Sequence, residues 1–211
     1  MTAGAGEVAG AEIMADADRL LAAFEHRWVV VDQESLWRSV DDEFVVAGWG
    51  VQTHLFMTHR RTPDRLGQLD AVREVAQADL LGAERRFAES QPWCTSPESA
   101  RQVLEHHRRI GRVLNERYFA IFDGDDVCAY AKLRERDAIA QVEDVVVLAE
   151  HRGSGLGRLV TTAALVAGLE RGPEVMFIVA DDDDWPKELY ARLGFVPAGR
   201  TRMFHRLPPP P

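Results

Sequence analysis

The stretch VVVLAEHRGSGLGR, residues 145–158, decides how the second half of the chain folds. An apolar, β-branched run meets a glycine-rich turn, and apolar residues then recur at helical spacing from Leu156 onward. A strand–turn–helix unit of this kind aims several backbone N–H groups at one point, and the helix N-terminus adds about half a positive charge there. We therefore expect a site for a phosphate-bearing cofactor at this turn.

The turn can be compared with three known kinds of phosphate-binding loop. A Walker A loop ends in Gly-Lys-Ser/Thr, whereas here Arg158 follows Gly157. A dinucleotide-binding fingerprint needs GxGxxG after the first strand of a fold, but this turn reads GxGxG and follows several predicted elements. The third pattern, Arg/Gln-x-x-Gly-x-Gly/Ala, is present as RGSGLG at residues 152–157.

This third pattern resembles the pyrophosphate loop of the GCN5-related N-acetyltransferase (GNAT) superfamily. The flanking sequence matches as well, because an apolar strand ends at Val147 and a second is expected over 175–180. The run ELYARLGF, residues 188–195, looks like the family's Leu-Tyr-x-x-x-Gly-Phe signature. The resemblance covers most of residues 69–207 and implies an α/β (α+β) fold, with a mixed, centrally splayed β-sheet and helices on both faces.

The resemblance implies acetyl-coenzyme A (acetyl-CoA) as the cofactor. The loop amides would hold its pyrophosphate, and Arg158 would add a charge-assisted contact. The strand backbone would bind the amide-bearing arm, and the Val147 N–H would polarise the acetyl carbonyl. Asp183 stands where the family often has an Asn that contacts the cofactor. The cofactor-binding residues implied are Val145, Val146, Val147, Arg152, Gly153, Ser154, Gly155, Leu156, Gly157, Arg158 and Asp183.

Three residues are candidates for proton transfer. An amine with a lysine-like pKa near 10.4 costs about 4.6 kcal/mol to deprotonate at pH 7, so a transferase needs a general base. Neighbouring strand residues face opposite sides, so we expect either Glu143 or Asp144 to face the acceptor, and we favour Glu143, directly or through water. The resemblance implies that Tyr190 protonates the leaving thiolate. The plainer interpretation is that the carboxylates are ordinary polar positions and that Tyr190 packs on the sheet.

We divide the chain into a flexible tail (1–15), an N-terminal α/β block (16–66), the transferase domain (67–207) and a second tail (208–211). Helices are predicted over 16–26, 32–40, 69–87, 96–114, 156–167 and 185–192. Strands are predicted over 28–31, 44–46, 51–57, 118–122, 127–133, 141–148, 175–180 and 195–207. Gly48-Trp49 before LFMTHR echoes Gly194-Phe195 before MFHR. The first block is thus either a degenerate partial repeat of the second or an unrelated unit.

The composition narrows the class of protein. The 211 residues are 46% hydrophobic and carry a formal net charge of -9, which fits a packed domain and disfavours nonspecific nucleic-acid binding. The basic run HHRR, residues 106–109, is interpreted as a solvated helix face that could border the acceptor. No membrane span, signal peptide or metal site is expected. Two cysteines without a CxxC motif favour a reduced, cytoplasmic setting.

The leading hypothesis is an acetyl-CoA-dependent N-acetyltransferase that acts on a primary amine of a small molecule or peptide by direct transfer. The acidic composition favours a cationic acceptor. One alternative is a noncatalytic protein that binds or senses acyl-CoA. Another is a structural interaction protein in which the N-terminal block forms a homodimer surface.

Overall fold

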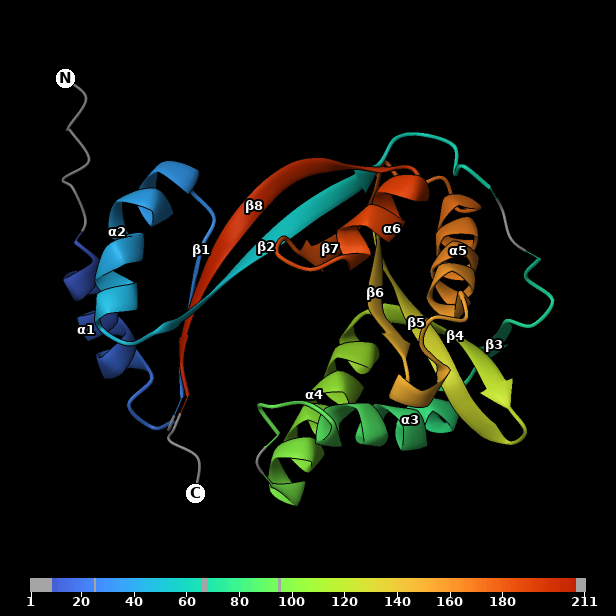
Figure 1. The fold of residues 1–211 in the computed structure, drawn as a ribbon, viewed down its shortest axis with the longest axis horizontal. Helices are drawn as coiled ribbons and strands as arrows, with labels where there is room; N and C mark the ends of the chain where they lie inside the picture. The colour runs from blue at the N-terminus through green and yellow to red at the C-terminus, as the bar shows by residue number, and fades with distance from the viewer. Residues whose placement is uncertain (1–8, 25, 66–67, 95, 208–211) are drawn as a thin grey trace. The chain divides into compact units, whose positions relative to one another are not determined.

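The computed structural model describes residues 9–24, 26–65, 68–94 and 96–207. The helices in these ranges are α1 (Gly10–Leu20), α2 (Glu34–Val46), α3 (Gln77–Glu89), α4 (Pro97–Val113), α5 (Leu156–Leu169) and α6 (Pro186–Arg192), and a 3-10 helix spans Ala149–His151. The strands are β1 (Arg27–Val31), β2 (Gly50–His59), β3 (Arg73–Val75), β4 (Asn115–Asp123), β5 (Asp126–Arg136), β6 (Ile139–Val147), β7 (Val175–Asp181) and β8 (Phe195–Arg206). They form a mixed sheet in the order β1-β8-β2-β7-β6-β5-β4-β3 (Figure 1).

The chain folds into two compact units whose limits differ from the predicted boundary at 66/67. The first unit comprises Met1–Phe56, Ala180–Lys187 and Pro197–Pro211. The second comprises Met57–Val179 and Glu188–Val196. The C-terminal strand therefore contributes most of its length to the first unit. Among the helices described, none has the length and apolar character that a membrane span requires.

The first unit is built on an antiparallel pair, in which β1 runs beside β8 from Arg27↔Arg206 to Val31↔Arg202. Phe44 of α2 is fully buried and stacks on Phe204 of β8, with ring centroids 3.9 Å apart. The predicted strand over 44–46 is wrong, because Trp37, Val40 and Phe44 continue one helical stripe into this core.

Helix α1 also begins earlier than predicted, inside the expected tail over 1–15, and it ends at Leu20. Its first turn is held by α2, since the Ala11 N–H donates to the Glu43 carboxylate at 3.0 Å. A carboxylate that accepts from a free N–H group in the first turn stabilises a helix start.

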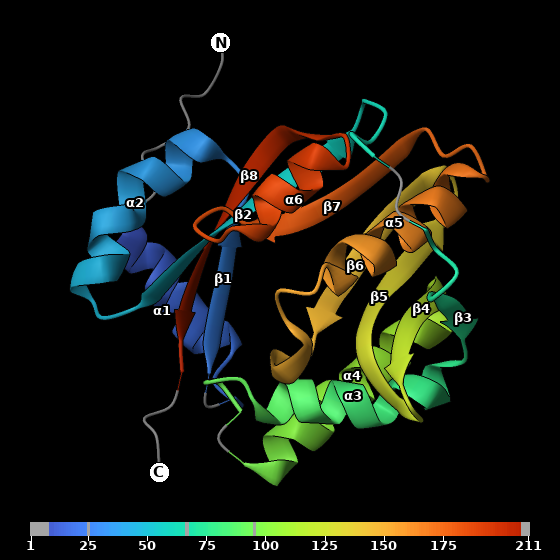
Figure 2. The same ribbon diagram turned by 45° about the vertical axis from the view of Figure 1, so that its right-hand side comes forward.

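The second unit places helices on both faces of the antiparallel strands β4, β5 and β6. Leu80 and Ala83 of α3 pack with Tyr130 of β5 and Val146 of β6 on one face. On the opposite face, Gly168 of α5 lies so close to the sheet that an added Cβ would meet the Leu133 side chain at 3.0 Å. Figure 2 shows α3 and α4 together on the first of these faces.

From residue 96 onward each predicted helix and strand is present, with shifted ends. The single helix predicted over 69–87 is wrong, however. A short strand, Arg73–Val75, precedes α3 and pairs with β4, whose Tyr118 lies opposite Val75. Strand pairing has overridden the helical pattern of this segment.

The parallel pair β6–β7 is short. Pairing runs from Ile139↔Val175 to Val142↔Ile178 and then stops, although both strands continue. Within the described residues, 143–147 of β6 thus have no partner in β7. This divergence is the predicted central splay of the sheet.

Gly194 fixes the chain that follows β2. Its φ is +97°, and its carbonyl accepts from the N–H groups of Arg60 and Arg61 at 3.0 and 3.1 Å. A Cβ at this position would lie 1.8 Å from the Arg61 carbonyl oxygen. Glycine is therefore required here by both backbone conformation and space.

Replacing Gly194 with Ala is expected to destabilise the protein. The left-handed conformation costs an L-residue about 1–2 kcal/mol, and the overlap with the Arg61 carbonyl adds to that cost. We expect thermal denaturation to show a melting temperature lower by more than about 4 °C. Gly199→Ala is the matched control, because no atom lies within 4 Å of its Cβ position. An equal loss in both variants would contradict this role of Gly194.

Candidate active site

The glycine turn presents unused backbone donors. Gly153 and Gly155 have φ of +79° and +84°, and nothing lies within 4 Å of either Cβ position. In the described parts of the chain, no hydrogen bond is donated by the N–H groups of residues 153–157. We expected the Arg158 N–H to be available to the pyrophosphate as well, but it donates to the Gly155 carbonyl at 3.1 Å in the first turn of α5. The amides of residues 153–157 are thus available to donate to a phosphate.

The end of β6 offers a second set of backbone groups. The Leu148 N–H donates to Cys128 of β5 at 3.0 Å, so in the antiparallel ladder the preceding pair, Val147↔Ala129, directs its N–H and C=O away from the partner strand. The Val147 carbonyl accepts from Arg152 Nε at 3.2 Å. The Val147 N–H consequently points to the side on which β7 has separated. The expected contact with the acetyl carbonyl requires this orientation.

Side chains around the turn are positively charged. Arg158 Nη1 lies 3.4 Å from the Arg65 carbonyl oxygen. Burial, together with the nearby charges of Arg65 and Arg192, lowers the pKa of Arg158. Crowded guanidinium groups of this kind are stabilised by an anion between them. The turn and its arginines therefore fit a pyrophosphate-bearing cofactor.

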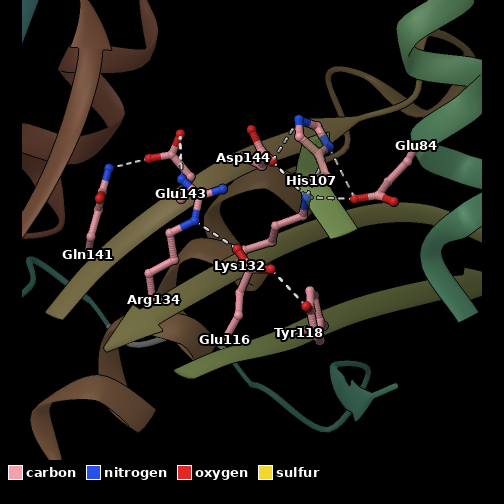
Figure 3. A network of polar contacts seen from close by, with 9 residues as sticks. All are labelled: Glu84, His107, Glu116, Tyr118, Lys132, Arg134, Gln141, Glu143 and Asp144. Atoms are coloured by element: carbon pink, nitrogen blue, oxygen red, sulfur yellow. Dashed lines mark hydrogen bonds and ion pairs between the residues drawn. The ribbon is translucent and has the colours of Figure 1, made fainter. Parts of the chain in front are cut away.

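Glu143 and Asp144 both lie on the face of β6 that carries the contacts with Lys132 and Arg134 (Figure 3). We expected only one of the two carboxylates to point to this face. Glu143 is opposite Lys132 of β5, and the register then shifts before Val146 pairs with Tyr130. Asp144 occupies this β-bulge with a φ of +47°. Because a bulge breaks the alternation of side chains, both carboxylates meet cations of the same β5 face. Asp144 meets Lys132 at 2.8 Å, and Glu143 meets Arg134 at 3.5 Å.

The two carboxylates differ in their electrostatics. Burial raises the pKa of Glu143 above its ordinary value, and the charge of Asp144 raises it further against the opposing effects of Arg134 and Lys132. Burial also opposes ionisation of Asp144, but Lys132 and then His107 lower its pKa below the usual range. Glu143 is thus the more basic of the two.

Helix α6, which carries Tyr190, lies beside the end of β6 and the first turn of α5. The Cβ position of Gly157 lies 3.4 Å from Val147 and 4.0 Å from Leu189, so the end of β6, the first turn of α5 and α6 meet. Tyr190 is buried, with its ring 6.4 Å from that of Phe195. Asp183 belongs to the first unit, where its N–H donates to Asp181 at 3.0 Å. A contact of Asp183 with the cofactor stays a prediction.

Sequence reasoning missed the buried cations and their partners. Lys132 is fully buried, 2.6 Å from Glu84 of α3. Arg134 lies 2.7 Å from Glu116 of β4. A signal was present, because Lys132 interrupts an apolar strand and Glu84 falls on the apolar stripe of α3. His107, which we placed on a solvated face, instead lies 3.5 Å from Glu84 and 4.0 Å from Asp144.

The model of the acetyltransferase (GNAT) family matches residues 80–195. No curated protein sequence matches the chain. A functionally unknown conserved protein from Staphylococcus epidermidis ATCC 12228 is 14% identical with a TM-score of 0.68, covering 93% of this chain and 80% of that one. A tandem GNAT protein from the clavulanic acid biosynthesis pathway is 18% identical with a TM-score of 0.58, covering 95% and 70%. A GCN5-related N-acetyltransferase from Kribbella flavida is 18% identical with a TM-score of 0.53, covering 94% and 77%.

These likenesses confirm the predicted fold class, and the family match confirms the resemblance drawn from the sequence. Because residues 80–195 make up more than half of the 211-residue chain, the protein belongs to the acetyltransferase (GNAT) family.

Proposed function

We propose that the protein is an acetyl-CoA-dependent N-acetyltransferase that moves the acetyl group to a primary amine by direct transfer. One observation carries this proposal. The stretch of β6 that has no partner in β7 within the described residues, 143–147, begins at Glu143 and leads into the glycine turn. A reactive group held by the turn can therefore reach a base across the strand edge without passing through a paired sheet.

The cofactor side uses backbone groups and arginines. The amides of residues 153–157 and the Arg158 guanidinium would hold the pyrophosphate, while Val147 offers an N–H to the carbonyl oxygen. When bound, acetyl-CoA supplies the acetyl group as an activated thioester. These donors are fixed by β6 and α5, so little reorganisation accompanies the reaction.

Glu143 is proposed as the general base. It takes a proton from the amine nitrogen, directly or through water, as that nitrogen bonds to the acetyl carbon and the carbon–sulfur bond breaks. Tyr190 would donate its phenolic proton to the leaving sulfur, and exchange with solvent would then reset both side chains. A carboxylate with a raised pKa is a stronger base while still ionised at neutral pH.

The charge around Glu143 favours a cationic acceptor. Four carboxylates, Glu84, Glu116, Glu143 and Asp144, share the network in Figure 3 with two permanent cations, Lys132 and Arg134. With Glu143 ionised, the network is net negative in either protonation state of His107. A primary amine arrives as an ammonium ion at neutral pH. We therefore propose that the acceptor is a small-molecule or peptide amine.

Acetyl-CoA is expected to stabilise the protein, adding about 2.7 kcal/mol to the unfolding free energy at 100 times its Kd. Arg158→Ala should weaken binding about tenfold or more, because a charge-assisted contact is lost. Thermal-shift titration checks both, with Arg85→Ala on α3 as the matched control. Stabilisation by NAD but not by acetyl-CoA would contradict the cofactor assignment.

Glu143→Gln should lower kcat by about 10²–10⁴-fold, because the base is lost while the shape of the side chain is kept. Tyr190→Phe should also lower kcat, with acetyl-CoA affinity retained in both variants. Thiol release in the presence of spermidine and a lysine-containing peptide measures turnover, and Glu105→Gln, at a partly exposed position of α4, is the control. Tight acetyl-CoA binding without turnover on any amine of a broader panel would favour the noncatalytic alternative.

A further inference from the structure

Asp144 lies beside the proposed base but is held quite differently. The Lys132 ammonium lies between two carboxylate oxygens, Asp144 Oδ2 at 2.8 Å and Glu84 Oε1 at 2.6 Å, and His107 Nδ1 is 3.4 Å away. The side chains of Lys132 and Glu84 are 0% and 2% exposed. Asp144 is thus paired with a buried cation that Glu84 also holds, whereas Glu143 meets Arg134 at 3.5 Å and the amide of Gln141.

The backbone conformation of Asp144 also distinguishes it from Glu143. A φ of +47° is uncommon for a residue other than glycine and is maintained only where its surroundings hold it. In a regular strand, Asp144 would face α5, away from Lys132. The bulge instead turns its carboxylate onto the cation, and the ion pair joins α3, β5 and β6.

We propose that Asp144 is a positioning residue, fixed in its ionised form by Lys132, which acts on Glu143 through its charge and does not itself exchange a proton with the acceptor. This inference rests on the proposed function, in which Glu143 is the base. It separates two neighbouring carboxylates that the sequence alone leaves equivalent.

The charged groups around this pair come from four elements. Lys132 and Arg134 lie on β5, Glu116 on β4, Glu84 on α3 and His107 on α4. Lys132 and Arg134 oppose the rise in the pKa of Glu143, whereas Glu116 and Asp144 support it. Removing the charge of Asp144 leaves both opposing cations in place. The pKa of Glu143 must then fall.

The test is a pH titration of protein labelled with ¹³C at its Asp and Glu carboxyl carbons. The Glu143 and Asp144 resonances are assigned by their loss in Glu143→Gln and Asp144→Asn. In the wild type, we expect Glu143 to titrate above its ordinary 4.5 and Asp144 below its ordinary 3.8. In Asp144→Asn, the Glu143 midpoint should move to lower pH, while Glu105→Gln should leave it unchanged.

Enzyme activity gives a second readout. The base works only when ionised, so kcat/KM should rise with pH through the pKa of Glu143, and this acid limb should move to lower pH in Asp144→Asn. Lys132→Met is expected to raise the Asp144 midpoint, although the loss of a buried partner destabilises the fold. If this variant does not fold, the wild-type and Asp144→Asn titrations still decide the inference.

The inference is overturned if Asp144 titrates above Glu143 in the wild type, or if the Glu143 midpoint stays or rises in Asp144→Asn. These carboxyl titrations need neither acceptor nor acetyl-CoA. Failure of the wild type to transfer acetyl groups would therefore overturn the proposed function separately.

Discussion

The proposed chemistry depends on the point at which β6 and β7 separate, after Val142 and Ile178. Buried backbone N–H and C=O groups almost always have partners, so a strand that loses its neighbour inside a sheet must find others. On the β5 side, the ladder of β6 continues to Leu148. On the other side, Arg152 meets the Val147 carbonyl, and the Val147 N–H is left for a ligand or water. A polypeptide-like arm of a cofactor satisfies such an edge as a neighbouring strand would.

The β-bulge at Asp144 changes the face of β6 that meets Lys132 and Arg134. It brings a second carboxylate beside Glu143, and the buried ammonium of Lys132 lowers the pKa of that carboxylate. Buried ion pairs add little net stability compared with apolar packing, because desolvation offsets their attraction. The Lys132 cluster is therefore better explained by what it does to Glu143 than by the stability of α3 on the sheet.

What could be predicted from the sequence was local. The glycine turn, with the strand before it and the helix after it, follows from residues adjacent in the chain, and the structure has them as predicted. The short strand Arg73–Val75 was missed because it exists only through pairing with β4. The orientation of Asp144 was missed for the same reason, since its partners Lys132 and Glu84 come from distant segments. Long-range ion pairs, rather than local pattern, set the geometry of Glu143 and Asp144.

The proposed reaction places two opposing requirements on the net negative network of Figure 3. An ammonium ion is attracted by surplus carboxylate charge, yet the same charge favours keeping its proton, which the reaction must remove. The pairing of Glu143 with Asp144 resolves this conflict, because moving the proton onto Glu143 ends the repulsion between two neighbouring carboxylates. In the proposed reaction, Asp144 keeps its charge beside Lys132, so protonation of Glu143 removes its repulsion with Asp144. This relief of repulsion offsets part of the free-energy cost of taking the proton from an acceptor that the same charges attract.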